Sequence, residues 1–93
     1  MTAGGRVLSV AAVVYPAASF AILRMTCGVS GIPGPNHLLM LGFVMPLLAA
    51  AVALACKMAG ARLPWAGVAA FGVWVGAVGA AHAWLIDLVW ASI

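Results

Sequence analysis

The stretch LLAAAVALA, at residues 47–55, is an unbroken run of apolar side chains. A strand of a transmembrane β-barrel alternates apolar and polar residues, so this continuous run predicts a helix instead. In the hydrocarbon core of a bilayer, helices and closed barrels are the structures that satisfy every backbone N–H and C=O group. The stretch therefore predicts an all-α integral membrane protein.

The composition of the whole chain agrees with this interpretation. Of its 93 residues, 68% are hydrophobic and 5% are charged, whereas a soluble domain has about 25% charged residues. A small domain buries only about 60% of its surface, so this chain cannot hide its apolar side chains in a core of its own. We expect the apolar excess to face lipid or other proteins. The net charge of +3 is too small and too dispersed to indicate nucleic-acid binding.

Three segments are long enough to cross a bilayer, which takes about 20 apolar residues. A Gly- and Pro-rich segment at residues 27–36 separates the first two, and a short connection at residues 57–64 separates the last two. Pro16 and Pro46 fall inside predicted helices, where we expect kinks. The sequence therefore predicts a single membrane domain over residues 1–93, with helices at about residues 7–25, 38–56 and 65–91.

The basic residues predict an orientation for these helices. Three spans place Arg6, Lys57 and Arg62 on one side of the membrane and Arg24 at the other. Because cytoplasmic segments carry an excess of Lys and Arg, we expect the N-terminus in the cytoplasm and the C-terminus outside. The expected location is a bacterial inner membrane, cytoplasmic or intracytoplasmic.

Small residues recur at helical spacing in the second and third predicted helices. Small side chains let helix backbones approach closely in a bilayer, where no hydrophobic drive brings helices together. The pattern predicts a small-residue-packed helical bundle, and the alternative is a composition biased toward Ala and Gly in general. The residues expected to pack the helices are Gly72, Gly76, Gly79 and Ala83 in the third helix and Gly42, Ala49 and Ala53 in the second.

The one acidic residue of the chain, Asp87, lies on this small-residue face of the third helix, and Arg24 lies near the same end of the membrane. An ionised side chain inside a span is costly and usually finds a partner. We expect Arg24 and Asp87 to form an ion pair, either with each other or with groups on a neighbouring subunit. A proton or ion pathway is the alternative, although a relay calls for several such groups at successive depths.

His82 points away from the small residues, toward a bulky apolar face of the same helix. That face also bears Phe71, Trp74, Val78, Leu85 and Val89. An imidazole facing lipid is poorly satisfied, so we expect this face to meet another protein or a bound cofactor. His82 is a candidate ligand for haem iron or for the magnesium of a (bacterio)chlorophyll. The alternative is a hydrogen bond from its ring to a neighbouring backbone group.

The segment Ala80-Ala81-His82-Ala83-Trp84 resembles light-harvesting polypeptides, in which a His lies among small residues with a Trp beyond it. This resemblance covers one span and assigns no family. It implies a pigment as the ligand of His82.

The sequence contains no nucleophile–base pair, phosphate-binding loop or metal-ligand spacing, so we expect no enzymatic activity. The predicted function is that of an accessory subunit of a larger energy-transducing membrane complex, respiratory or photosynthetic. Such a subunit stabilises assembly or shapes lipid or quinone access, with lipids and larger membrane subunits as its partners and no soluble substrate. The alternatives are a small homo-oligomeric transporter or channel, which lacks the expected polar pore stripe, and a pigment- or haem-binding polypeptide.

Overall fold

The structure is a computed structural model that describes residues 3–27 and 33–92. Its elements in chain order are α1 (Ala3–Thr26), α2 (Pro35–Leu39), the π-helix η1 (Met40–Val44), α3 (Met45–Met58) and α4 (Trp65–Ala91). Within the described residues the fold is therefore all-helical. Because α2, η1 and α3 follow one another without a break, residues 3–27 and 33–92 contain three helices that are long and apolar enough to cross a membrane. This confirms the predicted number of spans.

The helix bounds differ from the predicted ones mainly in the first two spans. The spanning helices cover Gly4–Thr26, Pro35–Met58 and Trp65–Ala91, so the third has the predicted bounds and the first two are longer. Most of the Gly- and Pro-rich connection, residues 28–32, lies outside the described residues.

The two internal prolines have different surroundings. Pro16 lies inside α1, which is helical on both sides of it. The turn before Pro46 is π-helical, and the backbone N–H of Met45 donates to the Met40 carbonyl. Since proline has no N–H to donate, the turn that precedes it loses a regular helical bond, and a π-helical turn is one way to accommodate that loss. The irregularity expected at Pro46 is thus a change of helix type.

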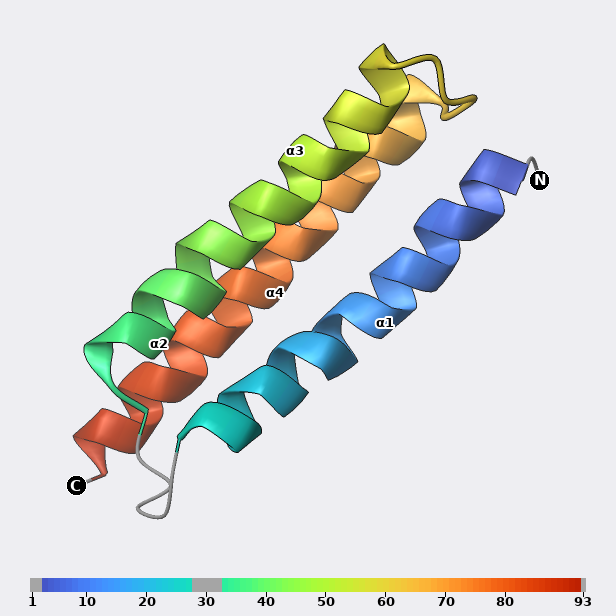
Figure 1. Cartoon of the computed structure of the whole chain (residues 1–93). Coiled ribbons are helices and arrows are strands. Elements are labelled where there is room, and N and C mark those ends of the chain that lie inside the picture. The colour runs from blue at the N-terminus through green and yellow to red at the C-terminus, as the bar shows by residue number, and fades with distance from the viewer. Residues whose placement is uncertain (1–2, 28–32, 93) are drawn as a thin grey trace.

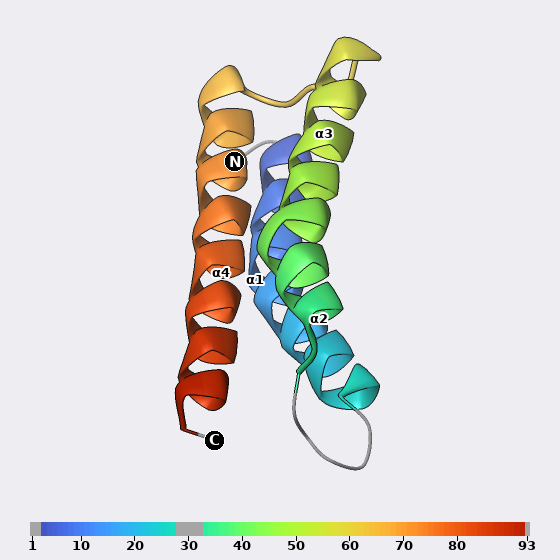
Figure 2. The same cartoon turned by 90° about the vertical axis from the view of Figure 1, so that its left-hand side faces the viewer.

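The three spanning helices form an elongated bundle in which α4 contacts both of the others. Figure 1 and Figure 2 show α3 alongside α4, with α1 on one side of this pair. The bundle measures 47 × 17 × 16 Å, and its long dimension exceeds the hydrocarbon thickness of a bilayer, about 30 Å. The arrangement makes α4 the central helix of the fold.

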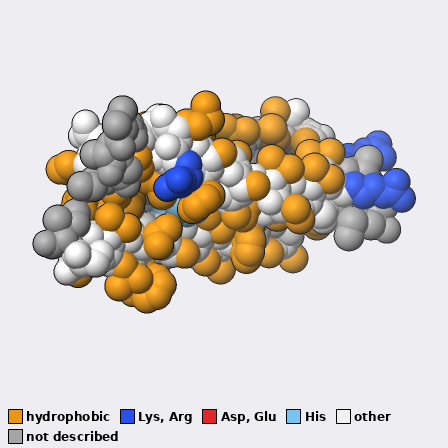
Figure 3. All heavy atoms as spheres, turned by 90° about the horizontal axis from the view of Figure 1, so that it is seen from below, with side chains coloured by type: hydrophobic (Ala, Val, Ile, Leu, Met, Phe, Trp, Pro, Cys, Tyr) orange, Lys and Arg blue, Asp and Glu red, His pale blue; other side chains and the backbone are white. Residues whose placement is uncertain are grey.

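Two clusters of buried apolar side chains hold the helices together, one toward each end of the bundle. One cluster comprises Ala53, Leu63, Val68, Phe71 and Val75. The other comprises Leu23, Leu41 and Ile86. Most other large apolar side chains are exposed, and hydrophobic atoms cover much of the face in Figure 3, with Lys and Arg gathered mainly at one end. Such a surface suits contact with lipid.

The turn between α3 and α4 is fixed by Gly60 and Lys57. Gly60 has φ of 102°, a conformation that glycine adopts without steric cost. The ammonium group of Lys57 donates a hydrogen bond to the Leu63 carbonyl and lies 5.2 Å from the centre of the Trp65 ring. Lys57 is therefore engaged within its own turn.

At the opposite end, His37 and Trp90 tie the start of α2 to α1 and α4. The backbone N–H of Gly34 donates to His37 Nδ1 over 3.0 Å, so the ring hydrogen is on Nε2 and donates to the Thr26 hydroxyl at 2.8 Å. The indole N–H of Trp90 donates to the Pro33 carbonyl over 2.6 Å. These bonds fix both ends of the connection whose middle lies outside the described residues.

Candidate functional site

His82 is buried between α4 and α1. Its side chain is 7% exposed, and its ring centre lies 6.5 Å from that of Phe20, with the two planes inclined by 47°. Nδ1 lies 2.9 Å from the Val78 carbonyl oxygen. Because a carbonyl only accepts hydrogen bonds, Nδ1 carries the hydrogen and the lone pair is on Nε2. This bond is the backbone hydrogen bond predicted as the alternative to cofactor ligation by His82.

A small hollow adjoins the His82 ring. It has a volume of about 260 Å³ and is lined by Pro16, Phe20, Ala81, His82 and Leu85. Pockets that bind small molecules usually have volumes of about 300–1,000 Å³. The hollow is thus smaller than a typical ligand pocket, and ligation of a macrocycle by His82 stays a prediction.

The helix face that bears His82 is covered in large part by α1 of the same chain. Phe71 and Val78 are buried, and the Trp74 indole N–H donates to the Ala12 carbonyl over 2.6 Å. Part of this face is therefore covered within the chain, whereas Trp74 and Leu85 are 44% and 36% exposed, and an external partner for the face stays a prediction. The sequence does not reveal which face of α4 meets α1, so an internal contact looked like a free surface.

Arg24 and Asp87 do not meet within the chain. Both belong to the described residues, both side chains are exposed, and no ion pair joins them. Arg24 borders a hollow between α1 and α4 together with Leu85 and Val89. Asp87 is two residues from both Leu85 and Val89, so it lies about half a turn around α4 from them, on the side away from α1. The predicted intramolecular pair is not formed, and pairing with a neighbouring subunit remains a prediction.

The predicted packing residues fall into two groups: those that contact another helix or a buried cluster of this chain, and those with open space beside them. In the first group, Gly79 lies against Gly42 and Pro46, and a Cβ on Gly42 would make ordinary contact with Ala83 at 3.5 Å. The other two members of this group are Ala53, in a buried cluster, and Ala49, packed against it.

Gly72 and Gly76 form the second group. A Cβ added to either would meet no described atom within 4 Å. Together with the exposed Asp87 they follow one side of α4, because Gly72 and Gly76 are four residues apart and Asp87 is about three turns beyond Gly76. We call these three residues the open strip. Gly79 and Ala83 lie on nearly the same side of α4 and face the helix that contains Gly42, so the open space beside α4 is established at Gly72 and Gly76 themselves.

Two buried hydroxyl groups were not singled out as polar sites by the sequence. The hydroxyls of Tyr15 and Ser19 are buried in α1 and form no hydrogen bond with the described residues. Other hydroxyls on the helices bond the backbone one turn earlier, as Thr26 does to the Ile22 carbonyl at 2.6 Å. Burial of a hydroxyl depends on which side of α1 faces the bundle, and no sequence signal identified that side.

The chain matches no known protein family, no curated protein and no solved structure. Among residues 3–27 and 33–92, no three His, Cys, Asp or Glu side chains are grouped so as to hold a metal ion.

Proposed function

We propose that this chain is a non-catalytic accessory subunit of a larger membrane complex, bound through the open strip of α4. The observation that carries the proposal is that Gly72 and Gly76 have free space around them while the chain's one acid, Asp87, is exposed on the same side. Small residues permit close approach of a helix, and an acidic group within a span calls for a basic or hydrogen-bonding partner. A helix of another subunit supplies both.

The proposed complex is an energy-transducing one of the respiratory or photosynthetic electron-transport type, in which the chain stabilises assembly or shapes lipid or quinone access. The proposed orientation is N-in and C-out in a bacterial inner membrane. It is supported by Arg6, Lys57 and Arg62, which flank one end of the bundle, because basic residues accumulate on the cytoplasmic side.

The first test is the replacement Asp87→Asn in the native host. We expect the amount of chain that co-migrates with a large complex in mild detergent to fall by about tenfold, since one interhelical polar contact in a membrane contributes up to about 1.7 kcal/mol. Asp87→Glu keeps the charge and is expected to keep most of the association. The stability of the isolated chain is expected to stay unchanged, because Asp87 is exposed and has no ion-pair partner within it. Undiminished co-migration of Asp87→Asn contradicts the proposal.

A homo-oligomeric transporter or channel is the second candidate. It is favoured by the exposed Arg24 and Asp87, whose opposite charges lie near the same end of the bundle but on different sides of it. Repeated pairing of Arg24 with Asp87 of the next copy would generate a ring or a chain of subunits. Purification of the native chain as a small, homogeneous oligomer supports this candidate and contradicts the larger complex.

Ligation of a haem or a (bacterio)chlorophyll by His82 is the third candidate, because the lone pair of Nε2 is not used in the bond to Val78. A ligating histidine usually donates its other ring N–H to a carbonyl or a carboxylate, as His82 does. Ligation of such a cofactor by His82 predicts a visible absorption band in the native preparation, and this band is expected to disappear in His82→Ala. The same spectrum in the wild type and in His82→Ala contradicts ligation.

A further inference from the structure

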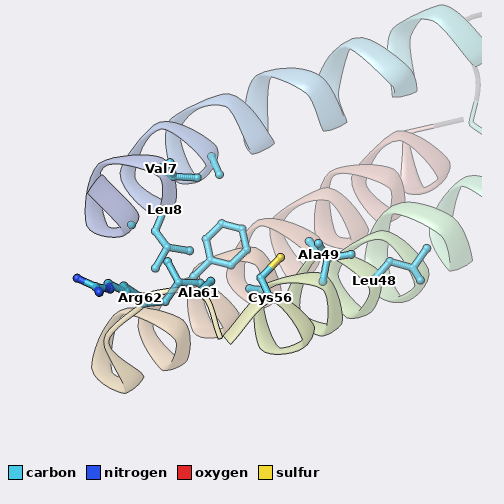
Figure 4. Close-up of a pocket in the computed structure, with 13 residues that line it drawn as sticks. Val7, Leu8, Leu48, Ala49, Cys56, Ala61 and Arg62 are labelled. Atoms are coloured by element: carbon cyan, nitrogen blue, oxygen red, sulfur yellow. The ribbon is translucent and has the colours of Figure 1, made fainter. Parts of the chain in front are cut away.

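A groove opens between α1 and α3 near the end of the bundle that carries Arg62. Its volume is about 550 Å³, within the range of about 300–1,000 Å³ that is usual for ligand sites. Figure 4 shows Val7 and Leu8 of α1 on one wall and Leu48, Ala49 and Cys56 of α3 on the other. Apart from Arg62, its lining residues are uncharged and almost all apolar.

The groove extends along only part of the bundle. On α3 its lining runs from Leu48 to Cys56 and on α1 from Gly4 to Ala11, which corresponds to about 12 Å at a rise of about 1.5 Å per residue. One leaflet contributes about half of the hydrocarbon core of about 30 Å. The groove therefore matches the depth of one leaflet, whereas a transmembrane helix of a partner would run along the whole bundle.

Two guanidinium groups are available at this end of the bundle. Arg62 lines the groove itself, and Arg6 borders an adjoining hollow that shares Val7 and Ala11 with it. Both side chains are exposed, and neither forms an ion pair with a described residue. Lys57, the third base at this end, is already bonded to the Leu63 carbonyl.

We propose that the groove binds an acyl chain of an anionic phospholipid, with the phosphate of the headgroup at Arg62. The apolar walls suit the acyl chain, and a guanidinium forms paired, charge-assisted hydrogen bonds with a phosphate. Basic sites between transmembrane helices commonly bind anionic headgroups. The inference does not depend on the proposed subunit role, since the groove shares no residue with the open strip.

The charge requirement is tested by native mass spectrometry of the full-length chain in mild detergent. The probes are phosphatidylglycerol and phosphatidylcholine with identical acyl chains. We expect tighter binding of phosphatidylglycerol, and a loss of about fivefold in its affinity in Arg62→Gln, as about 1 kcal/mol per basic residue near a headgroup implies. The matched control is Arg24→Gln, at the other end of the bundle, which is expected to keep the preference. Equal affinity of the wild type for both lipids overturns the proposal.

The position of the acyl chain is tested by filling the groove. Leu48→Trp places a large ring in the groove and is expected to lower the affinity for both lipids at least fivefold. Leu47→Trp is the matched control, because Leu47 is the preceding residue of α3 and does not line the groove. The two side chains are 59% and 71% exposed, respectively, so both variants are expected to fold, which circular dichroism checks. Undiminished binding in folded Leu48→Trp overturns the assignment of the groove, as does an equal loss in Leu47→Trp.

Discussion

Replacement of Gly79 by alanine is expected to lower the free energy of unfolding of the detergent-solubilised chain by about 2 kcal/mol, a typical cost of overpacking a close contact. A Cβ at this position would lie 2.5 Å from Pro46 Cγ, 2.9 Å from the Gly42 carbonyl oxygen and 3.2 Å from the Leu41 carbonyl oxygen. Two of these neighbours are backbone atoms and the third belongs to a rigid ring. The methyl group therefore fits only if α4 moves away from the helix that faces it.

The measurement is a titration with a denaturing detergent, followed by circular dichroism and tryptophan fluorescence. Gly76→Ala is the matched control on the same helix, and its methyl group would meet no described atom within 4 Å. Gly42→Ala is a second control, because the nearest neighbour of its added methyl group would be the Ala83 methyl group at an ordinary contact distance of 3.5 Å. Both are expected to change stability by less than about 0.5 kcal/mol. An equal loss in Gly76→Ala and Gly79→Ala contradicts the close approach of α4 to Pro46 and Gly42 at Gly79.

A second replacement examines why α4 comes so close at Gly79. Pro46 has no N–H to give to the carbonyls that precede it by four and five residues, which are those of Gly42 and Leu41. Both carbonyl oxygens lie toward Gly79, where Cα–H groups are weak donors to such oxygens. Combining Pro46→Ala with Gly79→Ala removes the shortest contact of the added methyl group. We expect the double variant to recover part of the stability lost in Gly79→Ala.

Hydropathy predicted the three helices that are long and apolar enough to cross a membrane. Gly42, Gly79 and Ala83 lie where helices of this chain meet. The helical spacing of small residues also included Gly72 and Gly76, which have no described neighbour within 4 Å. Small residues mark a surface that a helix is able to approach closely, but they do not specify which helix approaches. The spacing alone was therefore unable to separate contacts within the chain from surfaces left open.

The polar residues were harder to place for a related reason. Their predicted partners depended on the side of α4 that α1 covers, which hydropathy does not reveal because α4 is apolar on nearly all sides. The structure places His82 toward α1 and Asp87 away from the hollow beside Arg24. An interhelical hydrogen bond also joins residues distant in sequence, as Trp74 and Ala12 are. Neither composition nor helical periodicity predicts such a pair.

The hydrogen bond from Trp74 to Ala12 explains how α1 accommodates Pro16, at which the sequence predicted only a kink. Pro16 lies one turn after Ala12 in α1 and has no N–H to give to the Ala12 carbonyl. In a bilayer an unpaired carbonyl costs free energy, and the indole N–H of Trp74 supplies the missing donor at 2.6 Å. We expect Trp74→Phe to lower the free energy of unfolding by about 1–2 kcal/mol.

A double-mutant cycle tests this explanation, because Pro16→Ala restores a backbone N–H one turn after Ala12. With that donor present, Trp74→Phe is expected to cost about 1 kcal/mol less than it does in the wild-type background, a coupling typical of residues that share one network. Trp84→Phe is the control, since the Trp84 side chain is 66% exposed and its effect is expected to be the same in both backgrounds. Additive effects of Pro16→Ala and Trp74→Phe would show that the indole does not serve as the donor that Pro16 lacks, and α1 would then be held to α4 by apolar packing alone.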